Sequence, residues 1–127
     1  MRKFLRAFRY GQRGFTLIEL LIVVAILGIL AAVIIPNVSN MLFSATLNGA
    51  NTEAANVRTA AVAYMAENNG AWPATSGDLT AYFVGDPRAT YTLDTTTGLI
   101  TGAQPSGDNP WKGITWDEPK QLWIKEP

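Results

Sequence analysis

The sequence predicts an α+β fold in which one long N-terminal helix packs on a small antiparallel β-sheet of about four strands. Three features predict it: an apolar run over residues 17–35, helix-compatible sequence that continues to Asn69, and two pairs of strand-like segments after Gly70. The chain has 127 residues, which is enough for one folded domain.

The apolar run has the length and composition of a membrane-spanning helix. Its 19 residues contain one charged residue, Glu19. At about 1.5 Å per residue the run extends roughly 28 Å, close to the ~30 Å hydrocarbon core of a bilayer. A conventional secretory signal has an apolar stretch of only about 7–15 residues. A plain single-pass anchor fits the length but gives no role to Glu19.

The charges are distributed unevenly along the chain, although their sum is zero. The first fourteen residues hold five basic residues and no acid, so the remainder carries 5 − 10 = −5. A basic segment beside an apolar run is typical of the cytoplasmic flank of a membrane segment, which favours this interpretation over nucleic-acid binding. The basic residues are Arg2, Lys3, Arg6, Arg9 and Arg13.

The helix is expected to continue past Pro36 to about Asn69, with a bend near the proline, because membrane helices tolerate proline. Apolar residues recur after Pro36 at spacings of three and four, in an alanine-rich stripe that suits close packing. Asn68 and Gly70 flank Asn69 and predict the helix end, since glycine adopts the left-handed conformation readily.

Two β-hairpins are predicted after the helix, one around Gly98 and one around Pro119. A sheet of this size makes a thin core. The helix face that carries Val57, Ala61 and Tyr64 is therefore expected to lie across it. The expected strands are residues 90–93, 99–101, 113–116 and 121–124.

The chain contains no cysteine and no histidine. The first absence excludes a disulfide, a thiol nucleophile and a thiolate metal site. The second removes the commonest general base and metal ligand. No pair of catalytic groups stands out, so the sequence predicts a protein that is not an enzyme and has no cofactor.

A six-residue motif at the head of the apolar run carries the functional prediction. Residues 14–19 read Gly-Phe-Thr-Leu-Ile-Glu after a basic leader, and Gly28 and Pro36 follow in the run and at its end. This arrangement resembles the type IV prepilin and pseudopilin class over about a quarter of the chain. The resemblance implies cleavage between Gly14 and Phe15 by a prepilin peptidase, and methylation of the new amine of Phe15.

The resemblance divides the chain into four segments. Residues 1–14 are a leader that is removed, and residues 15–36 are the transmembrane and polymerisation helix. Residues 37–69 are the amphipathic half of the same helix, and residues 70–127 are a globular, pilin-like head with a loop and the antiparallel sheet.

Glu19 has two interpretations. A carboxylate in a membrane helix is costly and calls for a partner. The resemblance implies that the amine of Phe15 on an incoming subunit pairs with Glu19 of a subunit already in the filament. The plainer interpretation is that Glu19 reaches the polar interface of the membrane.

Gly28 and Pro36 also have two interpretations. Both residue types are common in transmembrane helices. The resemblance implies instead that the helix between them loosens when subunits pack into some filaments.

The resemblance also implies a set of partners. These are copies of the same chain in a helical filament, the prepilin peptidase, an inner-membrane assembly platform and a cytoplasmic assembly ATPase. The precursor is expected to span the inner membrane once, with the head on the periplasmic or external side. The mature chain then forms a pilus or pseudopilus at the cell surface or in the periplasm.

Calcium is a weaker expectation. Asp94, Asp108 and Asp117 lie in predicted loops, and carboxylate oxygens suit this ion. Major pseudopilins bind calcium in a carboxyl-terminal loop, but the spacing here matches no calcium motif, so turn residues are the simpler interpretation.

Four tryptophans are many for a small head, and we expect them in the core or at subunit contacts. They are Trp72, Trp111, Trp116 and Trp123.

Three functional hypotheses follow. The first is a structural filament subunit, either a type IV pilin or a type II secretion pseudopilin. The second is a monomeric, membrane-anchored binding module that keeps its leader. The third, an enzyme on a membrane tether, has the least support.

Overall fold

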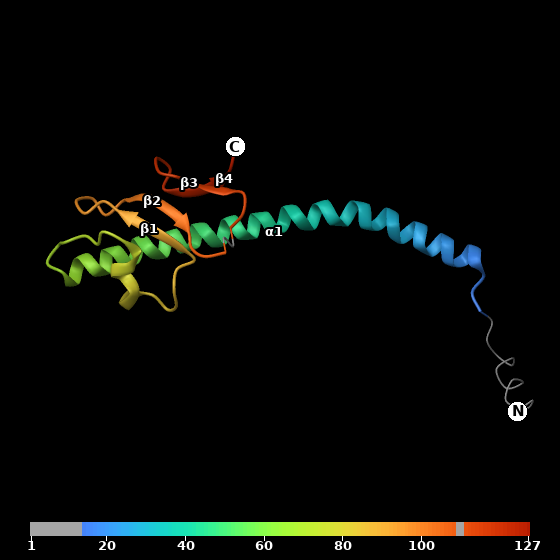
Figure 1. Ribbon diagram of the computed structural model, residues 1–127, viewed down its shortest axis with the longest axis horizontal. Coiled ribbons are helices and arrows are strands. Elements are labelled where there is room, and N and C mark those ends of the chain that lie inside the picture. Colours follow the sequence, from blue (N-terminus) through green and yellow to red (C-terminus); the bar gives the residue numbers. More distant parts are fainter. Residues whose placement is uncertain (1–13, 109–110) are drawn as a thin grey trace, which may run out of the picture. The chain divides into compact units, whose positions relative to one another are not determined.

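The computed structural model describes residues 14–108 and 111–127 (Figure 1). This part of the chain falls into two units, divided between Asn40 and Met41. Helix α1 (Leu17–Glu67) begins in the first unit and ends in the second, which we call the head. The other elements of the head are η2 (Ser76–Tyr82), β1 (Ala89–Leu93), β2 (Ile100–Pro105), β3 (Ile114–Asp117) and β4 (Leu122–Lys125).

Helix α1 confirms the predicted long helix, with Pro36 inside it. Its end is the predicted one: Gly70 donates its N–H to the carbonyl of Met65 at 2.9 Å. Asn69 and Gly70 both have positive φ, 56° and 86°. Such a bond and a left-handed residue are how helix ends satisfy their last carbonyls. The bend expected near Pro36 stays a prediction.

The core of the head lies between α1 and the hairpins. The buried face of α1 is made almost wholly of alanine, which allows the strands to approach the helix closely. It confirms the predicted face, because Val57 and Ala61 are fully buried and Tyr64 packs against them from the edge. The buried residues of α1 are Ala50, Ala54, Val57, Ala60 and Ala61.

The four predicted strands are present, and they form two antiparallel hairpins, β1–β2 and β3–β4, rather than one continuous sheet. A side chain explains the break. The amide of Gln121 accepts from the N–H of Ile100 at 3.0 Å and donates to the carbonyl of Ile100 at 2.7 Å. It therefore occupies backbone groups of β2 that a neighbouring strand would otherwise pair with.

Polar side chains of α1 bind the hairpins to the helix. Asn51 pairs with the backbone of Trp123, accepting from its N–H at 2.7 Å and donating to its carbonyl at 3.1 Å. The carboxylate of Glu53 accepts from the N–H groups of Arg88 and Ala89 at 2.9 and 3.1 Å. Backbone groups at strand edges are thus satisfied by the helix, as buried polar groups must be.

Aromatic rings fill the space between the hairpins. Trp111 and Trp123 are buried, and Trp123 makes edge contacts with the rings of Trp111, Trp116 and Tyr91. Trp72 covers Gly98, where an added Cβ would lie 2.2 Å from the indole. Of the four tryptophans expected in the core or at subunit contacts, Trp111 and Trp123 are in the core, and Trp72 and Trp116 are partly buried and pack against it.

Candidate functional site

The predicted cleavage site lies immediately before α1. Gly14, Phe15 and Thr16 are outside the helix and exposed, and the side chain of Phe15 is 78% accessible. An added Cβ at Gly14 would meet nothing within 4 Å. Among the described residues, nothing covers the Gly14–Phe15 bond. Cleavage and methylation themselves stay predictions. The rest of the leader lies outside the described residues.

The first turn of α1 is closed by two reciprocal hydrogen bonds. The N–H of Glu19 donates to Oγ1 of Thr16 at 3.3 Å, and the N–H of Thr16 donates to Oε2 of Glu19 at 3.2 Å. This is a capping box, in which a threonine before the helix and an acid three residues later satisfy each other's free N–H. A carboxylate here also faces the positive end of the helix dipole.

Sequence reasoning missed this role of Glu19. The signal was available, because a threonine followed three residues later by glutamate, just before an apolar run, indicates a capping box. The carboxylate therefore has a structural partner inside its own chain, in addition to the partner in a neighbouring subunit that the resemblance implies.

The apolar run is exposed along its whole length. Every residue from 17 to 35 is exposed, and the large aliphatic side chains among them are 50–77% accessible. Helix α1 is long and apolar enough over this part to cross a membrane. Glu19 is the one charge in this stretch, so the surface offers little but hydrocarbon to its surroundings.

Gly28 and Pro36 both lie within regular helix. Gly28 has open space around it, since an added Cβ would meet nothing within 4 Å. Pro36 has no N–H to give to the carbonyl four residues earlier, which weakens the helix there. Ser39 donates its hydroxyl to the carbonyl of Ile35 at 3.1 Å. The loosening of this stretch stays a prediction.

The three calcium candidates have separate local roles. Asp94 accepts from the hydroxyl and N–H of Thr96 and from the N–H of Thr97, and these bonds lower the pKa of its carboxyl. Asp117 is paired with Lys120 at 3.0 Å, which lowers the pKa of Asp117. Asp108 is exposed in a loop. Within residues 14–108 and 111–127, no three carboxylates are grouped to hold a metal, so calcium binding stays untested.

A family model of the prokaryotic N-terminal methylation motif matches residues 9–35. This chain belongs to the type IV pilin and pseudopilin family. The match covers the predicted cleavage site, the capping box and the exposed apolar run, which are the features that the geometry brings together at the start of α1.

Curated relatives come from both branches of the family. The type IV major fimbrial protein FimA of Dichelobacter nodosus is 51% identical over 49 residues, which is 39% of this chain. A fimbrial protein of Neisseria meningitidis serogroup A is 33% identical over 118 residues, or 90% of this chain. The type II secretion system core protein G of Pectobacterium carotovorum is 36% identical over 72 residues, or 57% of this chain.

The chain spans only part of the length of these relatives. The alignments cover 31% of FimA, 66% of the Neisseria protein and 46% of the secretion protein. No solved structure gives a significant match.

Proposed function

We propose that the chain is the precursor of a structural subunit in a type IV pilus-like filament. The observation that carries this proposal is the exposed apolar surface of α1 over residues 17–35, headed by a single capped carboxylate. Lipid covers such a surface in the membrane. Outside the membrane the surface needs another cover, and identical helices of neighbouring subunits supply one of matching length.

Assembly follows from the chemistry of the helix start. Cleavage after Gly14 leaves Phe15 with a free ammonium group, which a separate step then methylates. Oε2 of Glu19 is occupied by the N–H of Thr16, and a carboxylate has two oxygens with several acceptor positions. The remaining acceptors can take the Phe15 ammonium of an incoming subunit, so that both charges enter the apolar filament core as a pair.

The partners follow from the same steps. A prepilin peptidase removes residues 1–14, and an inner-membrane platform with a cytoplasmic ATPase extracts the helix from the bilayer. The precursor spans the inner membrane once, and the polymer stands at the cell surface or in the periplasm. The protein itself acts as a structural unit and not as an enzyme.

The second candidate is a pseudopilin of type II secretion. It is favoured by the likeness to core protein G, which covers 57% of this chain. Deleting the gene separates the two: loss of surface filaments indicates a pilin, and accumulation of exported proteins in the periplasm indicates a pseudopilin. If the deletion causes neither phenotype, the result favours the monomeric anchored module.

The first test is the intact mass of the chain from its native membrane or from sheared filaments. We expect the mass of residues 15–127 plus one methyl group. The full-length mass would mean that the leader is retained, and it would contradict the proposal.

A further inference from the structure

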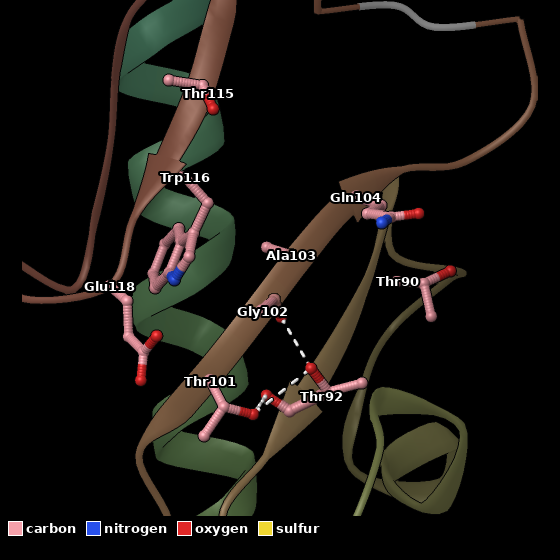
Figure 2. A pocket seen from close by; sticks show the side chains of 9 residues that line it. All are labelled: Thr90, Thr92, Thr101, Gly102, Ala103, Gln104, Thr115, Trp116 and Glu118. Carbon is pink, nitrogen blue, oxygen red and sulfur yellow. Dashed lines mark hydrogen bonds between the residues drawn. The ribbon is translucent and has the colours of Figure 1, made fainter.

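A wedge-shaped groove separates the two hairpins of the head. Figure 2 shows β2 and β3 diverging from the end where Thr101 and Glu118 lie. The groove has a volume of about 470 Å³, which is in the range of ligand sites. It is lined by Thr90, Thr92, Thr101, Gly102, Ala103, Gln104, Thr115, Trp116 and Glu118.

The backbone of β2 turns unpaired groups toward this groove. Tyr91 of β1 donates its N–H to Oγ of Ser76 at 3.0 Å, which lies away from β2. Tyr91 is opposite Ala103 in the hairpin. Antiparallel partners alternate between pairs that bond each other and pairs that point apart. The N–H and carbonyl of Ala103 therefore point away from β1, toward β3.

The backbone of β3 also turns unpaired groups toward the groove, from the opposite side. Trp123 of β4 exchanges both of its backbone bonds with the side chain of Asn51. Its partner in the hairpin is Trp116, so the N–H and carbonyl of Trp116 point away from β4, toward β2. Two open strand edges thus face each other, and no ladder joins them in the described part of the chain.

At the narrow end of the wedge, a side-chain amide takes the place of a peptide group. The side-chain amide of Gln121 both accepts from and donates to the backbone of Ile100, as a residue in a paired strand would. One amide fills the gap at that end. Beyond it, no backbone hydrogen bond joins Ala103 and Trp116 across the groove in the described part of the chain.

The wall of the groove also carries a spare side-chain donor. Nε1 of Trp116 is buried without a hydrogen-bond acceptor, and it is the one such side-chain atom among the residues that the structure describes. Figure 2 shows this nitrogen on the side of the ring that faces β2. Buried indole N–H groups usually have a partner. Because this one is enclosed, a peptide carbonyl reaches it only if the ring turns toward the groove.

We propose that the groove is a receptor for an extended peptide segment of another protein, which inserts between β2 and β3 and joins the two hairpins into one five-stranded sheet. Its peptide groups pair with Ala103 on one side and Trp116 on the other. Main-chain bonds give such strand addition its affinity, and alternate side chains give it specificity. Threonine hydroxyls line one rim of the groove, and they suit small polar residues on the exposed side of the peptide.

The charge of the groove indicates a basic residue in that peptide. Glu118 is the one charged residue that the described part of the chain contributes to the lining. A second hollow of about 500 Å³ shares Thr101 and Glu118 with it and adds Asp94. Among the residues that the structure describes, no lysine or arginine lines either hollow. The peptide is therefore expected to place a lysine or arginine at the end of the groove that Glu118 marks.

The test uses amide hydrogen exchange by NMR on the full processed chain in detergent micelles. The probe is the peptide Thr-Val-Thr-Val-Thr-Lys. Its matched controls have proline in place of the second valine, or glutamate in place of lysine. We expect the amides of Ala103 and Trp116 to exchange quickly in the free chain. With the probe they should slow by about tenfold, the effect of one hydrogen bond, and both control peptides should bind at least about tenfold more weakly.

Two variants of the chain sharpen the test. Ala103→Pro removes the edge N–H and should abolish protection at Trp116, whereas Ala103→Ser keeps the N–H and should retain it. Glu118→Lys should reverse the preference, so that the peptide with glutamate binds better. This variant keeps the test decisive if Ala103→Pro fails to fold.

Three results would overturn the proposal. The first is that Ala103 and Trp116 are already protected in the free chain, because β2 and β3 pair directly. The second is equal binding of the probe and its proline control. The third is that a neutral oligosaccharide such as maltohexaose protects these amides while the peptide does not.

Discussion

The N-terminal part of α1 and its continuation in the head differ in whether their side chains are exposed or packed against the rest of the chain. From residue 17 to 35 all positions are exposed and nearly all are apolar. From Ala50 to Ala61 one face is buried under the hairpins, and neighbouring positions such as Asn51 and Glu53 bond strand backbone. Apart from Glu19, whose carboxylate bonds Thr16, the side chains of the first stretch are exposed, whereas the buried face of the second stretch packs against the hairpins of the same chain. Substitutions in the first should therefore change processing and assembly, and those in the second should change the stability of the head.

The largest expected effect is on processing. Gly14→Leu places a branched side chain beside the scissile bond and should abolish cleavage, giving a chain of full-length mass. Gly28→Leu is the matched control, because it adds the same side chain inside α1 where an added Cβ meets nothing within 4 Å. It should be cleaved normally. A processed Gly14→Leu product would contradict the assigned cleavage site.

Glu19→Gln separates the two roles of the carboxylate. Glutamine can still close the capping box, but it cannot neutralise an incoming ammonium group. An unpaired buried charge costs about 3–5 kcal/mol, so filament yield, counted by electron microscopy, should fall by about tenfold or more. Thr16→Ala is the converse control, since it costs about 1 kcal/mol of capping and keeps the charge. Normal filaments from Glu19→Gln would leave capping as the role of Glu19.

Gly98→Ala should give the largest loss of stability in the head. Gly98 has φ of +71°, and an added Cβ would lie 2.2 Å from the ring of Trp72. Strain and crowding together should cost about 2–4 kcal/mol in the free energy of unfolding. Gly107→Ala has a similar φ of +65° with nothing within 4 Å, and it should cost only about 1 kcal/mol. Urea unfolding followed by tryptophan fluorescence compares the two.

Asn51→Ala tests the bond between α1 and β4. It leaves the N–H and carbonyl of Trp123 without their partner, which should cost about 1–3 kcal/mol. Asn48→Ala, one turn earlier at an exposed position, should change the unfolding free energy by less than about 0.5 kcal/mol. Equal effects of the two would show that the Asn51 bonds contribute nothing.

Tyr91 should give the head a weak dependence on alkaline pH. Burial raises the pKa of its hydroxyl, and the nearby Glu53 carboxylate adds to the shift. Above about pH 10 an unfolded tyrosine loses its proton while the folded one keeps it. The folded state then binds more protons, so stability falls as the pH rises. Tyr91→Phe should flatten this fall in stability between about pH 10 and 11. Tyr64→Phe changes a ring that does not bond Glu53, so the fall in stability should stay as steep as in the unsubstituted chain.

Local signals in the sequence predicted most of the fold. Asn69 and Gly70 mark the end of α1, and both hairpins lie where glycine and proline turns separate strand-like segments. The division into two sheets could not be predicted, because it depends on a bond between Ile100 and Gln121, which are 21 residues apart. The bond between Asn51 and Trp123, 72 residues apart, has no local signature either.

Two features of the candidate site also differ in whether a local sequence signal could predict them. The capping box is local, and the residues at 16 and 19 would have been enough to predict it. Calcium binding stays a prediction, and turn residues are the simpler interpretation of the same acids. Asp94 bonds residues two and three positions on, as a turn residue does.

Gln121 also has a mechanical consequence. Its main-chain carbonyl accepts from Arg58 of α1 at 2.8 Å, while its side-chain amide holds Ile100 of β2. One residue therefore links the helix to both hairpins. When a filament is pulled, the ladders within each hairpin share the load over many parallel bonds. In the described part of the chain, the seam between the hairpins relies on the bonds of Gln121 to Ile100 and on the bond from Nε1 of Trp123 to the hydroxyl of Tyr91 at 3.2 Å. The seam should yield first under tension, and the head should extend by separating two intact hairpins.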